Sequence, residues 1–152
     1  MNIEEFERVL AGAAVAIEVR MREALERGAV MIEREAKREI GHYHGAVGPL
    51  PRWRRLGPST LRERTRLGYG PPANPLPRTG GLRDSIKHSV SGPGEAIEAR
   101  VGVNGMVAVV QERGGGHVPA PSYLERAAKR KEGAVVQEVS RLAAAVLGIR
   151  AR

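Results

Sequence analysis

Three consecutive glycines, Gly114–Gly116, have the composition of a phosphate-binding loop. Such a loop in front of a helix can cradle a phosphate, because its backbone N–H groups point at the anion. Here the stretch "HVPAP" separates the glycines from the next predicted helix, and its two prolines lack N–H donors. No Lys-Ser or Lys-Thr pair follows the glycines. We therefore interpret them as a joint between two elements.

Two further constellations could support chemistry. His42 and His44 form an H-x-H pair to which His117 could add a third zinc ligand. The pair lies in a glycine-rich stretch without a nearby acid or cysteine, so we expect loop histidines and no metal or other cofactor. Asp84, Ser85 and His88 are the residue types of a hydrolase triad. On a strand Ser85 and His88 would face opposite sides and could not act as nucleophile and base. We therefore expect no enzymatic activity.

The segment "PRWRRL" combines an aromatic side chain with arginines. This mixture suits stacking on a base and binding of phosphates. It also suits a loop whose tryptophan is buried and whose arginines face solvent or an acidic neighbouring subunit, and we prefer this second interpretation. The candidate residues for a subunit or partner interface are Trp53, Arg54, Arg55, Leu56, Arg62, Arg64, Arg66 and Arg78.

The elements that must position these residues belong to one domain, as expected for 152 residues. The net charge of +8 is concentrated in residues 41–94, which hold nine Lys or Arg and two Asp or Glu. Such a surface suits nucleic acid or an acidic protein surface. There is no cysteine. The longest apolar run is far too short for a bilayer, so we expect a soluble protein without membrane contact.

Residues 1–40 have the apolar periodicity of one long helix. The stripe comprises Ile3, Phe6, Leu10, Ala13, Ile17, Met21 and Ala24, and continues to Ile40 with a small shift. At about 1.5 Å per residue such a helix spans over about 50 Å, more than a small domain can cover. Part of the stripe is therefore expected to pack on another subunit. The alternative is a helix that breaks at Gly28 and folds back.

The remaining chain predicts an α+β fold. Residues 41–78 form an extended basic loop, rich in proline and glycine, with one short helix from Pro58 through Arg66. Residues 82–112 form a β-hairpin region of about three antiparallel strands, with period two from Leu82 onward and a turn at Asn104-Gly105. Residues 122–147 form a C-terminal helix, with a Ser122–Glu125 capping box.

Two stretches together resemble a family of tailed-bacteriophage proteins, the tail-completion or virion-morphogenesis (minor tail and neck) proteins. The first stretch carries the family's order of tryptophan, leucine, threonine and basic residues, then leucine, Thr-Gly, leucine and serine. In this chain these are Trp53, Leu56, Thr60, Arg64, Leu76, Thr79, Gly80, Leu82, Ser85 and Ile86. The second stretch matches the apolar, glutamate, glycine and proline order that leads into the final helix. Here it comprises Ala108, Glu112, Gly114, Pro119, Pro121, Leu124 and Ala127.

The resemblance implies a structural, non-catalytic subunit of the phage head–tail junction. It implies a homo-oligomeric ring of six or twelve copies, located in the virion and made in the cytoplasm of the bacterial host. Its partners would be the head–tail connector and the tail terminator or tail tube, with DNA passing through the channel. The alternative from charge alone is a small basic nucleic-acid-binding protein.

Overall fold

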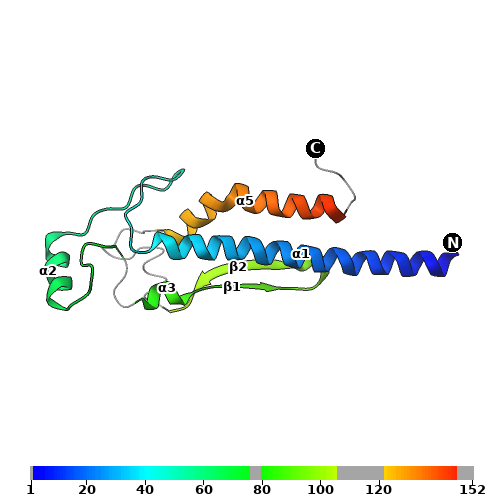
Figure 1. Ribbon diagram of the computed structural model, residues 1–152, viewed down its shortest axis with the longest axis horizontal. Helices are drawn as coiled ribbons and strands as arrows, with labels where there is room; N and C mark the ends of the chain where they lie inside the picture. Colours follow the sequence, from blue (N-terminus) through cyan, green and yellow to red (C-terminus); the bar gives the residue numbers. More distant parts are fainter. Residues whose placement is uncertain (1, 76–79, 106–121, 147–152) are drawn as a thin grey trace.

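The computed structural model describes residues 2–75, 80–105 and 122–146, which form an elongated α+β molecule (Figure 1). Its elements are α1 (Ile3–Glu39), α2 (Pro58–Arg66), α3 (Gly81–Ser85), β1 (Ile86–Ser91), the 3-10 turn η1 (Gly94–Ala96), β2 (Glu98–Val103) and α5 (Tyr123–Val146). The predicted fold class and order of elements are confirmed. The predicted third strand within 106–112, the glycines 114–116 and the candidate zinc ligand His117 lie outside the described residues.

Helix α1 is continuous through Gly28, so the alternative of a helix that breaks there is wrong. It begins at a capping box in which the Asn2 side chain accepts from the Glu5 N–H at 2.8 Å, while the Glu5 carboxylate accepts from the Asn2 N–H at 3.0 Å. A Cβ atom at Gly28 would lie 3.1 Å from Val135 Cγ1. The glycine therefore allows α5 to approach closely, which offsets its low helix propensity.

Helix α5 runs antiparallel to α1 along the C-terminal part of α1 (Figure 1). Small residues line this contact, since Ala24, Ala29 and Ala36 are all buried. Three ion pairs join the helices: Arg27 Nε–Glu138 Oε1 at 2.6 Å, Lys131 Nζ–Glu35 Oε2 at 3.4 Å and Arg130 Nε–Glu39 Oε1 at 3.0 Å. The predicted C-terminal helix is thus confirmed, whereas its Ser122–Glu125 capping box stays a prediction.

Strands β1 and β2 pair antiparallel, with Ile86 opposite Val103 and Val90 opposite Ala99. The alternation predicted for β1 is confirmed, because Ile86 is buried while Lys87 is exposed. The prediction that the strand begins at Leu82 is wrong. The backbone N–H of Asp84 donates to the Gly80 carbonyl at 3.1 Å, so this stretch closes a turn of helix α3. Four residues are too few for a period-two pattern to exclude a helical turn.

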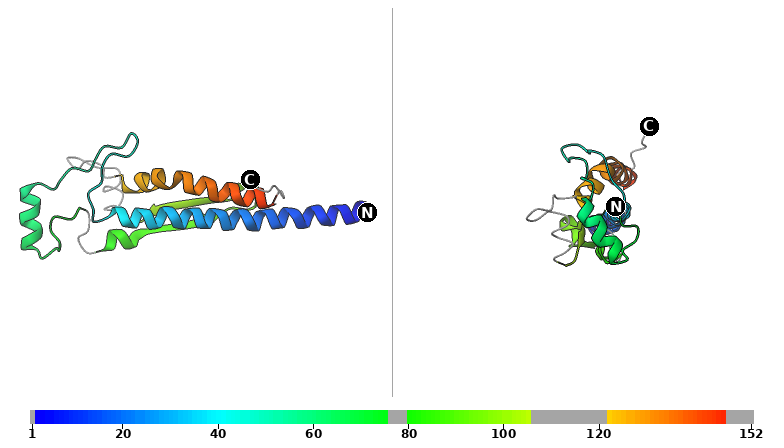
Figure 2. Two further views of the ribbon diagram at one scale, coloured as in Figure 1. Left: turned by 45° about the horizontal axis from the view of Figure 1, so that its top comes forward. Right: turned by 90° about the vertical axis from the view of Figure 1, so that its left-hand side faces the viewer.

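The hairpin and α5 lie on different sides of α1 (Figure 2). At the hairpin tip Gly92 has a φ of 95°, and a Cβ there would lie 2.0 Å from the Ala96 carbonyl oxygen, so only glycine fits. Arg22 of α1 donates to the Gly92 carbonyl at 2.8 Å and holds the tip. The buried core lies at the other end of the hairpin. It comprises Ala36, Ile40, Trp53, Ile86, Tyr123 and Ala127.

Candidate interaction surfaces

Residues 41–75, which we name the arm, project beyond the C-terminal end of α1, at the opposite end of the molecule from the N-terminus (Figures 1 and 2). The arm closes at its base, where the Gly41 N–H donates to the Pro75 carbonyl at 3.1 Å. Its one helix, α2, begins at Pro58, whose missing N–H costs nothing in a first turn. The boundaries predicted for this short helix are confirmed.

The base of the arm is fixed to α5. Arg126, 1% exposed, donates to the Gly45 carbonyl at 2.7 Å and to the Pro51 carbonyl. Its guanidinium also lies 5.9 Å from the centre of the Trp53 ring, in cation–π geometry. The His44 ring meets Trp53 edge-on, with 5.0 Å between ring centres. The base of the arm therefore packs within the chain, because Arg126 satisfies its carbonyl groups.

A buried carboxylate completes this junction. Glu39, at the end of α1, is 1% exposed and lies 3.0 Å from Arg130 Nε and 3.3 Å from His44 Nε2. His44 Nε2 also lies 2.9 Å from the Glu39 carbonyl oxygen, so the ring nitrogen donates there. His44 therefore has a structural contact within the chain. Among the residues described, no group of three or more His, Asp or Glu side chains is placed to hold a metal ion.

The candidate interface residues separate into two groups. Trp53 and Arg64 are turned inward, since Arg64 is 6% exposed and donates to the Pro72 and Asn74 carbonyls. Leu56 is half-buried, with its N–H donating to the Tyr43 hydroxyl at 3.0 Å. The exposed group comprises Arg54, Arg55, Arg62 and Arg66, while Arg78 lies outside the described residues. We name these four arginines the arm arginines.

A second open surface lies at the far end of α1. Every residue from Asn2 to Ile17 is exposed, including large apolar side chains of the stripe. Ile3 is 77% exposed, Phe6 50% and Leu10 52%. The helix here extends beyond both α5 and the hairpin (Figure 1). The stripe that α5 and the hairpin cover farther along is thus left uncovered over residues 3–17, which we name the free half of α1.

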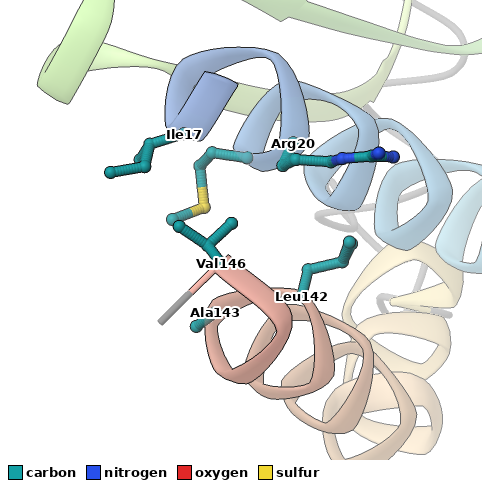
Figure 3. Close-up of a pocket in the computed structure, with 6 residues that line it drawn as sticks. Ile17, Arg20, Leu142, Ala143 and Val146 are labelled. Carbon is teal, nitrogen blue, oxygen red and sulfur yellow. The ribbon is translucent and has the colours of Figure 1, made fainter. Parts of the chain in front are cut away.

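An apolar pocket marks where α5 ends on α1. It has a volume of about 180 Å³ and is lined by Ile17, Arg20, Met21, Leu142, Ala143 and Val146. Figure 3 shows Val146 and Leu142 of α5 facing α1 while the Arg20 side chain points away. The pocket continues the apolar stripe of the free half of α1. No described helix combines the length and apolarity needed to cross a membrane.

His88 is placed by β1 against α1 rather than in a triad. Its Nε2 lies 2.7 Å from Glu26 Oε1, and its Nδ1 contacts the Glu33 carboxylate, which also pairs with Lys37. The hydrogen bond to Glu33, followed by that to Glu26, raises the pKa of His88 above its usual value. Hydrogen bonds from Lys37 and then His88 lower the pKa of Glu33. A protonated histidine donates from both ring nitrogens. His88 of β1 thus contacts two carboxylates of α1, and these contacts join the strand to the helix.

The Ser85 hydroxyl donates instead to the Leu82 carbonyl at 2.7 Å, which fits a helix end rather than a nucleophile. Sequence reasoning missed Arg126, Glu39 and the two carboxylates at His88. Their types are ordinary on exposed helix faces, and only the packing of distant segments reveals them. The described residues therefore offer two surfaces for macromolecular contact, the arm arginines and the free half of α1.

Comparison with protein-family models, with curated proteins and with solved structures finds no match to this chain.

Proposed function

We propose that this chain is a structural subunit of the phage head–tail junction, in a homo-oligomeric neck or tail-completion ring around the DNA channel. Its partners would be further copies of itself, the connector on the head side and the tail terminator or tail tube. The proposal assigns no catalytic role. The sequence resemblance motivates it, and the apolar surface that the folded chain leaves exposed on α1 supports it.

The exposed apolar side chains of the free half of α1 are the observation that carries this proposal. Ile3 is 77% exposed, Phe6 50% and Leu10 52%. Large apolar side chains that gather on an exposed surface are typical of a contact with another protein. A subunit of a ring requires such contacts with its neighbours.

The arm supplies a contact surface of a different character. Its base is fixed by Arg126 and Trp53, and the arm arginines are exposed beyond this base. Arginine is well suited to contacts with carboxylates, because its planar fork of donors can bind both oxygens. We propose that the arm arginines contact acidic side chains of an adjacent subunit or of the neighbouring ring.

The experiment is charge reversal on the arm. In a phage that carries this chain, the double variant Arg54→Glu with Arg55→Glu is expected to lower the yield of joined virions at least about 100-fold, because carboxylates would then face the acidic partner. Circular dichroism of the purified variant should be unchanged, since both side chains are exposed. The matched control is Arg83→Glu with Arg100→Glu, two exposed arginines outside the arm, and it should join heads to tails normally.

Normal virion yield from the arm variant would contradict the proposal. The alternative raised by the charge distribution is that the same exposed arginines bind nucleic acid. That function requires DNA affinity that falls steeply with salt, by about 0.9 in the logarithmic slope for each neutralised phosphate. A filter-binding titration across salt concentrations separates the two, since a protein contact predicts weak DNA binding in the native chain and in the arm variant alike.

A further inference from the structure

We propose that helix α2 is the recognition element of the arm. In this assignment Arg62 and Arg66 form the pair that contacts the acidic partner, and Arg64 is the residue that positions the pair. The assignment rests on the proposed function, since it names the part of the arm that meets the partner. Its support comes from the hydrogen bonds of α2 and of the segment that follows it.

Arg64 joins α2 to the rest of the arm. It is 6% exposed, although α2 lies at the far end of the arm, away from the body (Figure 2). Its guanidinium donates to the carbonyl groups of Pro72 and Asn74. These carbonyls belong to residues 67–75, which lead from α2 back to the base of the arm and which we name the return segment. Burial of a guanidinium is unfavourable unless its donors are satisfied, and these carbonyls satisfy them.

The end of α2 fixes the return segment through the backbone as well. The N–H of Tyr69 donates to the Arg64 carbonyl at 3.0 Å, and the N–H of Gly68 donates to the Thr65 carbonyl at 3.2 Å. Gly68 has a φ of 69°, in the left-handed region. This is the Schellman pattern, in which a glycine reverses the chain after a helix. Arg64 therefore holds the return segment twice, through its own carbonyl and through its side chain.

The face of α2 opposite Arg64 carries two exposed arginines, Arg62 and Arg66. Successive residues lie about 100° apart around a helix, so the midpoint between Arg62 and Arg66 lies about 180° from Arg64. Residues four positions apart are neighbours on the helix surface, with about 5–6 Å between their Cβ atoms. Because Arg64 is turned toward the return segment, Arg62 and Arg66 face away from it, next to each other.

This face of α2 suits the carboxylates of a protein. Two carboxylates one helical turn apart have the same spacing as the two arginines, and each arginine can bind both oxygens of one carboxylate. Glu63 is also exposed, between the two arginines in the sequence. A carboxylate beside the pair is unfavourable next to a phosphate backbone, but it can pair with a basic residue of a protein. Mixed charges of this kind give a protein contact its specificity.

The other two arm arginines have a different setting. Arg54 and Arg55 precede α2 in the chain, and the Arg55 guanidinium lies 5.8 Å from the centre of the Tyr43 ring, in cation–π geometry. They are thus placed by the base of the arm, whereas the pair at Arg62 and Arg66 is placed by α2. Substitutions in the two pairs therefore test different parts of the arm.

The first experiment removes the charge of the α2 pair. In a phage that carries this chain, Arg62→Gln with Arg66→Gln is expected to lower the yield of joined virions at least about 10-fold, because two ion pairs with the partner are lost. Glutamine is a good helix former, so α2 is retained. The matched control is Arg83→Gln with Arg100→Gln, which removes the same charge from exposed positions outside the arm and should leave the yield unchanged.

The positioning role of Arg64 is tested in two backgrounds. Arg64→Gln alone should lower the yield about as much as loss of the pair. Added to Arg62→Gln with Arg66→Gln, it should lower the yield no further, because a residue that acts through the pair has nothing left to position. A further loss in that background would show a general structural role, and a normal yield from Arg64→Gln alone would show no role. Either result would overturn the assignment of Arg64.

The position of α2 is measured in the purified chain. The chain contains no cysteine, so Ser59→Cys with Ala73→Cys places two spin labels at defined, exposed positions on α2 and on the return segment. Pulsed electron paramagnetic resonance should give a narrow distance distribution with Arg64 present and a broad one in Arg64→Gln. Equal distributions in the two chains would contradict a positioning role.

The yields also separate this inference from the proposed function. Loss of yield from Arg54→Glu with Arg55→Glu, together with a normal yield from Arg62→Gln with Arg66→Gln, would overturn the assignment to α2 and keep the head–tail role. A normal yield from both double variants would contradict the head–tail role itself.

Discussion

The two halves of α1 carry one apolar stripe but differ in what covers it. From Ala24 to Glu39 the helix lies against α5 and the hairpin, and its small residues are buried. Over residues 3–17 every side chain is exposed, including Phe6 and Leu10. Small residues allow helices of one chain to approach closely, whereas large exposed ones indicate a partner from outside. The two halves thus differ in whether their own chain covers the stripe and not in residue size, since residues 11–14 are small and still exposed.

The largest expected effect is on the free energy of unfolding, and it differs between the covered core and the free half of α1. Ile86→Ala removes a fully buried side chain packed in the core beside α1, and should lower the free energy of unfolding by about 2–5 kcal/mol. Leu10→Ala should change it by less than about 0.5 kcal/mol at concentrations where the chain is monomeric. Urea unfolding monitored by circular dichroism measures both. A comparable loss from Leu10→Ala would mean that the free half is covered within the single chain.

The two glycines of α1 give the next test. Gly28→Leu forces a side chain against Val135, whose Cγ1 would lie 3.1 Å from the new Cβ, and should destabilise the chain by about 1–3 kcal/mol through overpacking. Gly12→Leu meets no atom within 4 Å and should increase helix content, because leucine is the better helix former. Equal destabilisation by both would show that Gly12 is also packed against another element.

The smallest expected effect is a pH dependence of stability, which arises from the contacts of His88 with Glu26 and Glu33 on the covered half of α1. The His88 pKa is raised, so the contribution of His88 is complete below its usual value of 6.5 and is lost as the pH rises through the raised pKa. The Glu33 pKa is lowered from 4.5, so the contribution of Glu33 is lost as the pH falls through that lower pKa. The cluster therefore stabilises the chain most between about pH 4.5 and 6.5.

His88→Gln should flatten this dependence, with an effect below about 1 kcal/mol for each ion pair. Thermal unfolding measured from pH 5 to 9 provides the comparison. Lys87→Gln, at an exposed neighbour on the same strand, should keep the native profile. An unchanged profile in His88→Gln would show that the histidine does not carry a charge between Glu26 and Glu33.

The elements that could be predicted from the sequence are those with local signals. The α1 stripe, the Pro58 start of α2 and the alternation around Val101 each reflect periodicity or a residue at a turn. The capping box of Asn2 and Glu5 is also a local signal, since an N-cap residue is followed three positions later by a glutamate. Leu82–Ser85 is predicted wrongly as strand, because its period-two pattern is too short to exclude a helical turn.

The interaction surfaces were predictable only in part, for a physical reason. The sequence identified the arginine-rich segment and the overlong stripe, since composition and periodicity are local properties. It could not identify which arginines are exposed. Arg62 and Arg64, two positions apart, lie on different faces of α2, and the sequence does not show that the face of Arg64 meets the Pro72 and Asn74 carbonyls. Arg126 is a similar case, because its partners lie 75 and 81 residues away in the sequence.

The central claim is that the free half of α1 is left for a neighbouring protein of the junction, whereas the remainder of α1 is covered by its own chain. Amide hydrogen exchange of the purified chain and of the chain in assembled virions tests it most directly. Residues 3–17 should exchange rapidly in the purified chain and gain protection on assembly, while residues 24–39 should be protected equally in both. Equal protection of residues 3–17 in the purified and the assembled chain would contradict the account.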